Sequence, residues 1–270
     1  MRLAIINTAR LRVREGLVFA GGDFGRDVLN TFSAILVQHG DEALLFDSGL
    51  GSRIEAQYRA DMPRWQRPFF RYEAPVRPAA AQLAGRGLPP VSRIILSHSH
   101  WDHASALGDF PDAEVWAAPE ELGAVAHPHG GVGGAWPSQV GAAAIRWRAL
   151  RFAPIPYRGF QRSLDLFGDG SLVLVPLFGH TAGSVGLFAT TASGRCYFFV
   201  GDAVWSASAL NEGAAKFWPA RVLVDHDAAA TLAVIEEIRR VQRAYPDVVV
   251  VPAHDGRVQA ALGFFPKWLP

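Results

Sequence analysis

The sequence contains one cysteine, Cys196, among 270 residues. A single thiol forms neither an internal disulfide nor a thiolate metal cage, so a cysteine-stapled secreted scaffold is excluded. Charge of one sign is also scarce, because 26 Lys and Arg face 25 Asp and Glu, for a net charge of +1. Such a balance gives no strong field for nucleic acid or acidic membranes, and we expect neither as a partner.

Long hydrophobic runs are missing as well. A membrane span needs about 20 apolar residues, and the N-terminal apolar run is soon interrupted by Arg10. The longest charge-free stretch, 171–194, contains Pro176, Gly179 and His180, so two strands joined by a polar turn account for it. We expect a soluble, cytoplasmic protein that acts on a small molecule, and the sequence leaves the oligomeric state open.

Apolar residues make up half of the chain, which is enough for a sizeable core, and we expect one large domain over 1–270. The β-rich runs first come in pairs and later alternate with helical patterns. This order favours an α+β fold, with sheets packed on each other and helices outside, over one doubly wound parallel sheet. The expected strands are 3–8, 33–38, 43–47, 93–97, 114–117, 172–177, 185–190, 196–201 and 248–252.

The clearest helical pattern covers 227–244. Asp227 is well placed to cap its N-terminus, and charged side chains gather on one side of the predicted helix. The opposite, apolar face is formed by Leu232, Ile235, Ile238 and Val241.

Three segments are expected to be loops or insertions within the domain. Residues 14–30 and 127–137 are rich in glycine, which predicts exposed connections. Residues 62–78 mix four aromatic residues with four prolines, a composition that suits an irregular flap better than a helix or strand.

The flap contributes candidate substrate-binding residues. An aromatic core would need a regular period, which the prolines interrupt, so an apolar wall over a pocket stands as an equal alternative to a place in the core. The residues expected in this wall are Trp65, Phe69 and Phe70, together with Phe24 from the first loop.

Three of the nine histidines lie within six residues, in the run His98-Ser99-His100-Trp101-Asp102-His103. The run begins at the carboxyl end of a predicted strand, where side chains can converge on a cleft. His98 and His100 point the same way from an extended chain, and Asp102 and His103, after the chain turns, can face a second ion. A surface turn would explain one lone histidine, but this density favours metal binding.

The run matches the His-x-His-x-Asp-His signature completely, and here the sequence resembles the metallo-β-lactamase superfamily. That family adds a histidine after a later strand, an aspartate that bridges the metals and a final histidine, and the chain offers His180, Asp202 and His254 in that order. The turn Asp47-Ser48-Gly49 is also similar to one in the family. The resemblance spans roughly 33–256 and implies a four-layer αββα sandwich.

The resemblance further implies two divalent ions, the first held by His98, His100 and His180 and the second by Asp102, His103 and His254, with Asp202 as the bridge. Imidazoles and carboxylates suit zinc, which is the metal we expect. Two such ions about 3.5–4 Å apart can share a bridging hydroxide whose pKa is pulled towards ~7. Manganese or iron accept the same ligands.

The ligand set also narrows the branch of the family. His100 stands where an iron-based, oxygen-reducing branch has a glutamate, and Asp202 stands where the antibiotic-hydrolysing branch has a thiolate. Cys196 lies in a predicted strand, so we interpret it as a buried packing residue. What remains resembles the bridging-aspartate hydrolases, with N-acyl homoserine lactonases foremost.

We therefore expect a hydrolase that opens a lactone or carboxylic ester of a small apolar substrate. The bridging hydroxide would attack a metal-polarised carbonyl, and Asp102 or Asp202 would take and deliver the proton. A thioesterase of the glutathione-thioester type is the nearest alternative. A phosphodiesterase is a less favoured alternative, because the sequence has no dense run of basic residues that would bind a polyanion. A non-enzymatic metal-binding sensor would have lost metal ligands, and none is lost.

Trp205 marks a departure from the lactonases, which have a tyrosine three residues after the bridging aspartate. That tyrosine is placed to donate a hydrogen bond to the substrate carbonyl, whereas the indole N–H of Trp205 has a different reach and direction. We expect Trp205 to contact substrate, Trp205→Phe to change the rate only modestly, and acyl homoserine lactone activity to be weak.

Overall fold

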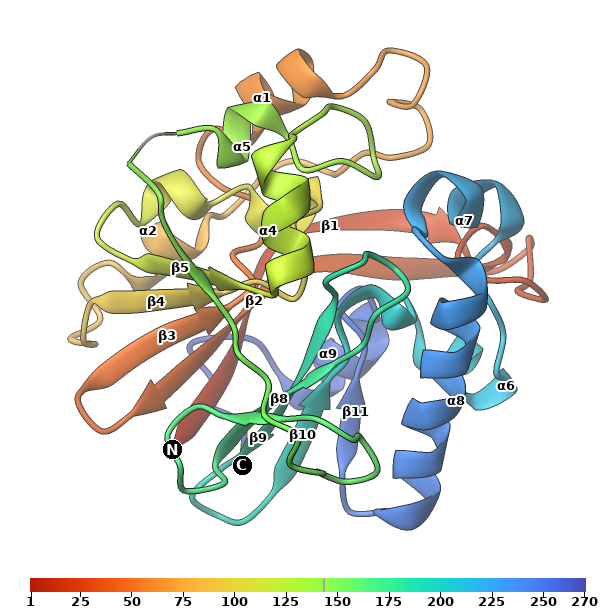
Figure 1. The fold of residues 1–270 in the computed structure, drawn as a ribbon. Coiled ribbons are helices and arrows are strands. Elements are labelled where there is room, and N and C mark those ends of the chain that lie inside the picture. Colours follow the sequence, from red (N-terminus) through yellow and green to blue (C-terminus); the bar gives the residue numbers. More distant parts are fainter. Residues whose placement is uncertain (143) are drawn as a thin grey trace.

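The computed structural model describes residues 1–142 and 144–270, which form two β-sheets packed face to face with helices on both outer sides (Figure 1). The strand orders are β1-β2-β3-β4-β5-β6 in one sheet and β11-β10-β9-β8-β7 in the other. This confirms the predicted α+β, four-layer αββα sandwich. The strands are β1 Arg2–Arg14, β2 Asp27–His39, β3 Glu42–Phe46, β4 Val91–Ile95, β5 Glu114–Ala117, β6 Arg146–Ala149, β7 Leu164–Asp165, β8 Leu172–Pro176, β9 Val185–Thr190, β10 Cys196–Phe199 and β11 Val249–Val251.

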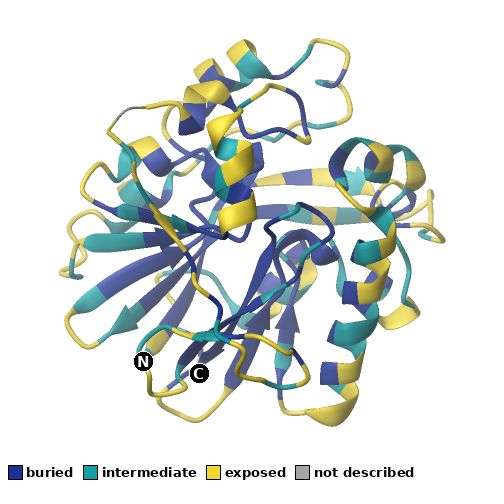
Figure 2. Cartoon of the chain, in the orientation of Figure 1, coloured by how far each residue is buried: buried dark blue, intermediate teal, exposed yellow. Residues whose placement is uncertain are grey.

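Side chains alternate between the two faces of a strand, and the apolar segments of the longer strands are buried on both faces. In β1, Leu3 and Ile5 pack between the two sheets, whereas Ala4 and Ile6 pack under helices on the outer side. Figure 2 shows the strand interiors buried and the outer sides of the helices exposed. Apolar runs without polar alternation are therefore expected in the central strands of this sandwich.

The helices cover the two outer faces. The longest, α8 (Ala228–Ala244), packs on the second sheet. The carboxylate of Asp227 accepts hydrogen bonds from Ala229 N and Ala230 N at 2.9 Å, which confirms the predicted cap. Leu232 was expected in the buried face but is 37% exposed, and Val234 packs in the core instead. The helices are α1 Ile54–Asp61, α2 Ala79–Leu83, α3 Trp101–Ala104, α4 Pro119–Ala126, α5 Pro137–Val140, α6 Ala207–Glu212, α7 Trp218–Val224, α8 Ala228–Ala244 and α9 Gly256–Leu262.

Two of the predicted loops differ from the structure. The expected connection 14–30 is shorter, because β1 and β2 pair antiparallel as far as Arg14 and Asp27 and extend as a long hairpin beyond the sheet core (Figure 1). The segment 127–137 is not wholly exposed, since Val132 and Trp136 are buried in an aromatic cluster. The flap 62–78 is irregular as expected. Among the described residues, no helix has both the length and the hydrophobicity to cross a bilayer.

The topology brings several strand ends to one edge of the sandwich. β3 and β4 are parallel in the first sheet, and β8, β10 and β11 share one direction in the second. Residues that follow the carboxyl ends of these strands therefore meet at the same edge. They are Asp47 after β3, His98 after β4, His180 after β8, Asp202 after β10 and His254 after β11.

Candidate metal centre

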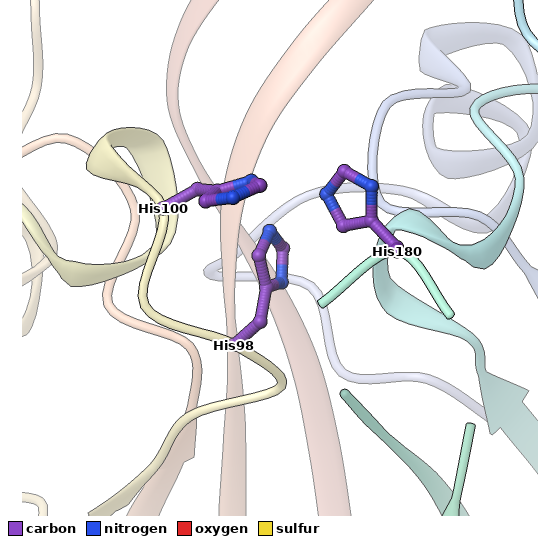
Figure 3. Close-up of side chains that lie close together, drawn as sticks. All are labelled: His98, His100 and His180. Carbon is purple, nitrogen blue, oxygen red and sulfur yellow. The ribbon is translucent and has the colours of Figure 1, made fainter. Parts of the chain in front are cut away.

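Three histidines converge at this edge from the two sheets. His98 and His100 follow β4, and His180 lies in the turn after β8 (Figure 3). All three are buried, and one ligand nitrogen from each lies within 4.8 Å of the others. Their ring centroids are 4.6 to 4.7 Å apart. The structure thus brings together the first predicted group of metal ligands.

A second group lies beside the first. Ligand atoms of Asp102, His103 and His254 are also within 4.8 Å of one another, and so are those of His98, His103 and Asp202. α3 begins directly after His100, so the chain turns and presents Asp102 and His103 on the helix. The His98 and His103 rings are 4.1 Å apart, and the two groups are therefore neighbours.

Asp202 contacts members of both groups. Its Oδ1 lies 3.3 Å from His103 Nε2 and 3.1 Å from His254 Nε2. Its Oδ2 lies 3.5 Å from His180 Nε2. One carboxylate therefore contacts members of both clusters.

The donor atoms fit metal ions. Four buried atoms at the centre have no hydrogen-bond partner among the described residues. They are Nε2 of His98, His103 and His180, and Oδ1 of Asp202. Buried polar atoms normally have partners. Nitrogen and oxygen atoms that converge without protons between them are the ligands that divalent cations such as zinc accept.

Hydrogen bonds on the far side of the rings fix this orientation. His103 Nδ1 donates to Asp47 Oδ2 at 2.8 Å, and His254 Nδ1 donates to the Thr31 carbonyl at 2.8 Å. Because Nδ1 carries the proton in each, the Nε2 lone pair is left for a metal ion. Asp47 also accepts from Ser97 N and Ser97 Oγ, which holds the carboxylate in place.

His180 is held differently. Its Nδ1 donates to Asp225 Oδ1 at 2.7 Å, and the same oxygen accepts from Lys216 Nζ at 2.7 Å. Asp225 and Lys216 are both buried within the structure. The sequence signals neither residue, since both lie far from the histidine run and no spacing relates them to a ligand.

A buried glutamate, Glu121 at the start of α4, ties the two turns that carry the first group. Its carboxylate accepts from Ser99 N at 2.7 Å and from Ser99 Oγ, and from Thr181 Oγ1 at 2.6 Å. A Cβ on Gly183 would lie 2.4 Å from Glu121 N, so glycine permits this close approach. Sequence analysis did not identify Glu121.

Electrostatics keeps the first group neutral. Burial, reinforced by neighbouring imidazoles, holds the pKa of His98 and of His100 well below the usual histidine range. Burial also lowers the pKa of His180, with a further contribution from the Lys216 cation. Neutral imidazoles are the form that binds metal ions.

The shared carboxylate of Asp202 keeps its negative charge beside the second group. Burial disfavours ionisation of Asp202, yet the imidazoles of His254 and His103 hold its pKa well below its ordinary value. Burial also disfavours a charged His103, but Asp47, Asp102 and Asp202 together raise its pKa well above the usual range. Carboxylates that attract a proton to this position attract a divalent cation equally.

The two groups open into a cavity of about 670 Å³. Trp65, Phe69, Phe70 and Trp205 line it, while Phe24 does not. Phe24 instead packs edge-on against Phe217, with the ring centroids 5.9 Å apart. Trp65 and Phe69 are 61% and 71% exposed at the rim, as a flap predicts.

Trp205 does not offer its N–H to the cavity. The indole Nε1 donates to Asp202 Oδ2 at 2.7 Å. The indole N–H, whose reach and direction differ from those of a tyrosine hydroxyl, therefore contacts the shared carboxylate. The side chain still lines the cavity with its ring.

Comparison with known proteins agrees with this geometry. The family model of the metallo-β-lactamase superfamily matches residues 32–254. A probable metallo-hydrolase of Mycobacterium tuberculosis is 28% identical over 243 residues, which cover 82% of this chain and 73% of that protein.

Two solved structures show the likeness in fold. An N-acyl homoserine lactone hydrolase with the product N-hexanoyl-L-homoserine at its catalytic metal center has a TM-score of 0.78 at 15% identity, covering 99% of this chain and 98% of the other. AidC, a dizinc quorum-quenching lactonase, has a TM-score of 0.59 at 16% identity, covering 93% and 86%. The family match over most of the chain, together with the clustered histidines and aspartates, identifies the chain as a metallo-hydrolase that belongs to the metallo-β-lactamase superfamily.

Proposed function

We propose that this protein is a dinuclear metal hydrolase that opens a lactone or carboxylic ester of a small apolar substrate. The observation that carries the proposal is the pair of ligand groups that share Asp202 in the wall of a largely apolar cavity. A fold neighbour described as a dizinc lactonase supports two ions at such a centre.

His98, His100 and His180 would hold one ion and Asp102, His103 and His254 the other, with Asp202 between them. Zinc is the metal we propose, because neutral imidazoles and carboxylates at a buried site are its usual ligands, while manganese and iron accept the same set. When bound, the ions supply Lewis-acid activation of the carbonyl and of water.

The chain itself supplies proton transfer and binding. Asp102 and Asp202 both line the cavity, and we assign the transfer of the proton to the leaving oxygen to one of these two carboxylates. Aromatic and aliphatic side chains from the β1–β2 hairpin, the flap and the region of α7 form most of the wall. An acyl or ring substituent without charge fits this lining best, which favours esters and lactones over phosphodiesters.

A substrate panel on metal-replete protein tests the proposal. We expect turnover of lactones or carboxylic esters to exceed that of phosphodiesters, two metal ions per chain by elemental analysis, and loss of both activity and metal in His180→Ala. His127→Ala is the matched control, since His127 is exposed and lies outside the ligand groups. A preparation that stays active without stoichiometric metal after chelation refutes the metal mechanism. Preference for a glutathione thioester would replace the ester assignment by a thioesterase.

A further inference from the structure

Lys216 is a buried cation close to the metal centre. It lies between α6 and α7 and is one of two lysines in the sequence, the other being the exposed Lys267. Its side chain is 2% exposed, and its backbone pairs with Phe19 of the β1–β2 connection. Removing an ammonium ion and its carboxylate partner from water carries a desolvation penalty that can exceed their attraction, so such a pair is weak grounds for a purely stabilising role.

The lysine belongs to a closed circuit of side chains. Lys216 Nζ contacts Asp225 Oδ1 at 2.7 Å, and Asp225 Oδ1 accepts from His180 Nδ1 at 2.7 Å. His180 Nε2 lies 3.5 Å from Asp202 Oδ2, which accepts from Trp205 Nε1 at 2.7 Å. The Trp205 ring centroid is in turn 5.5 Å from Lys216 Nζ. Lys216 therefore contacts both Asp225, which holds His180, and Trp205, which holds Asp202.

We propose that Lys216 is a positioning residue of the subsite formed by His98, His100 and His180. Its charge balances Asp225, which then holds His180 through Nδ1 with Nε2 directed at the ion. Its contact with Trp205 supports the indole that holds Asp202. The inference rests on the proposed two-ion centre but is independent of the substrate class.

In the part of the chain that the structure describes, the second subsite has no such cation. Asp47, the carboxylate behind His103, is held by Ser97 N and Ser97 Oγ, and no lysine or arginine pairs with it among the described residues. His254 is held by the Thr31 carbonyl, which is neutral. Loss of the Lys216 charge should therefore weaken binding of the ion held by His98, His100 and His180 much more than binding of the other ion, which shares only Asp202 with it.

A double-mutant cycle tests the charge balance. In Lys216→Met the carboxylate of Asp225 is buried without its cation, and in Asp225→Asn the cation is buried without its carboxylate. Both single variants should bind one of two Zn²⁺ ions about 10–100-fold more weakly in chelator competition, the usual cost of losing a support behind a ligand. In the double variant, the amide oxygen introduced by Asp225→Asn still accepts from His180 and no unpaired charge remains, so Zn²⁺ affinity should recover to within a few-fold of wild type.

Lys267→Met serves as the control and should leave both ions unchanged. Folding of every variant is checked by circular dichroism, and absorption of Co²⁺-substituted protein reports whether one or both subsites are filled. Three outcomes would overturn the proposal. They are wild-type Zn²⁺ affinity in Lys216→Met, equally weakened binding of both ions, and weaker Zn²⁺ binding in the double variant than in either single variant.

A folding defect in Lys216→Met does not remove the test. The double variant must then bind the weaker ion more tightly than Asp225→Asn does, because only the latter retains an unpaired cation, and equal or weaker binding overturns the proposal. A wild-type protein that binds fewer than two ions would instead contradict the two-ion centre itself.

Discussion

Replacing Trp205 by phenylalanine removes one hydrogen bond to the carboxylate shared by both ligand groups. The indole N–H donates to Asp202 Oδ2 at 2.7 Å, and phenylalanine keeps an aromatic ring in the half-buried position without this donor. The variant therefore isolates the support of Asp202 from the packing of the side chain.

The expected loss follows from the charge of the acceptor. A hydrogen bond to an ionised group contributes about 1.5–3 kcal/mol, compared with roughly 1 kcal/mol for a neutral pair. This corresponds to roughly 10- to 100-fold in metal affinity, which is also the range for outer supports of metal ligands. From the sequence we expected only a modest change in rate, because loss of a neutral hydrogen bond costs about 0.5–1.5 kcal/mol.

Chelator competition measures the affinity for Zn²⁺, and kcat/KM on the best ester substrate measures the effect on catalysis. We expect both to fall in Trp205→Phe by a similar factor, since the change acts through the metal centre. Trp218→Phe is the matched control, because Trp218 is exposed on α7 and does not line the cavity. Zn²⁺ affinity and kcat/KM within twofold of wild type in Trp205→Phe would show that this hydrogen bond does not support the centre.

Three further outcomes are expected. Asp202→Asn should lose one ion per chain and more than about 100-fold in turnover, because the amide removes the charge that would lie between the two proposed cations. Unchanged metal content would place the bridge elsewhere. Phe69→Ala should weaken the binding of long acyl substrates more than that of short ones, by up to about 0.8 kcal/mol per methylene left uncovered. In the control Ile155→Ala, which lies outside the cavity, the change in binding should not depend on chain length. Burial raises the pKa of Tyr58 from 10.0 to about 12. The contribution of the neutral Tyr58 hydroxyl to folding stability should therefore be complete below pH 10 and lost as pH rises towards 12. A Tyr58→Phe variant whose melting temperature falls equally at alkaline pH would contradict this.

The central strands and α8 could be predicted because their signals are local. Apolar runs bounded by turn residues locate β5 and β9 with their observed bounds, and Asp227 marks the start of α8. β6 and β7 were missed, since they are short edge strands with exposed positions and little apolar character. These two strands form because they pair with β5 and β8, and no local sequence pattern encodes this tertiary pairing.

The length of the β1–β2 hairpin shows the same limit. Glycines between residues 14 and 30 indicate a turn, but they do not say how far pairing continues on either side. Pairing reaches Arg14 and Asp27, which also form an ion pair at 3.2 Å. This extension places Leu11 and Val13 in the cavity wall, where sequence analysis expected only a loop nearby.

The candidate ligands were predictable and their supports were not. Metal ligands must converge on a point, so several of them occur in a short run whose spacing is visible, such as His98 to His103. A support such as Asp225 or Lys216 needs only to touch one side chain, and it can enter from any element of the fold. Its position in the sequence therefore carries no pattern that single-sequence reasoning can detect.

The orientation of the centre is built into the protein. Nδ1 of His103, His180 and His254 donates to a chain acceptor, and Glu121 joins the two turns that carry the first ligand group. These bonds order the imidazoles through the fold, so the conformational entropy of arranging them is lost during folding. Metal binding then has little further ordering to overcome, and we expect its affinity to depend chiefly on the charge balance set by Asp202 and by residues such as Lys216.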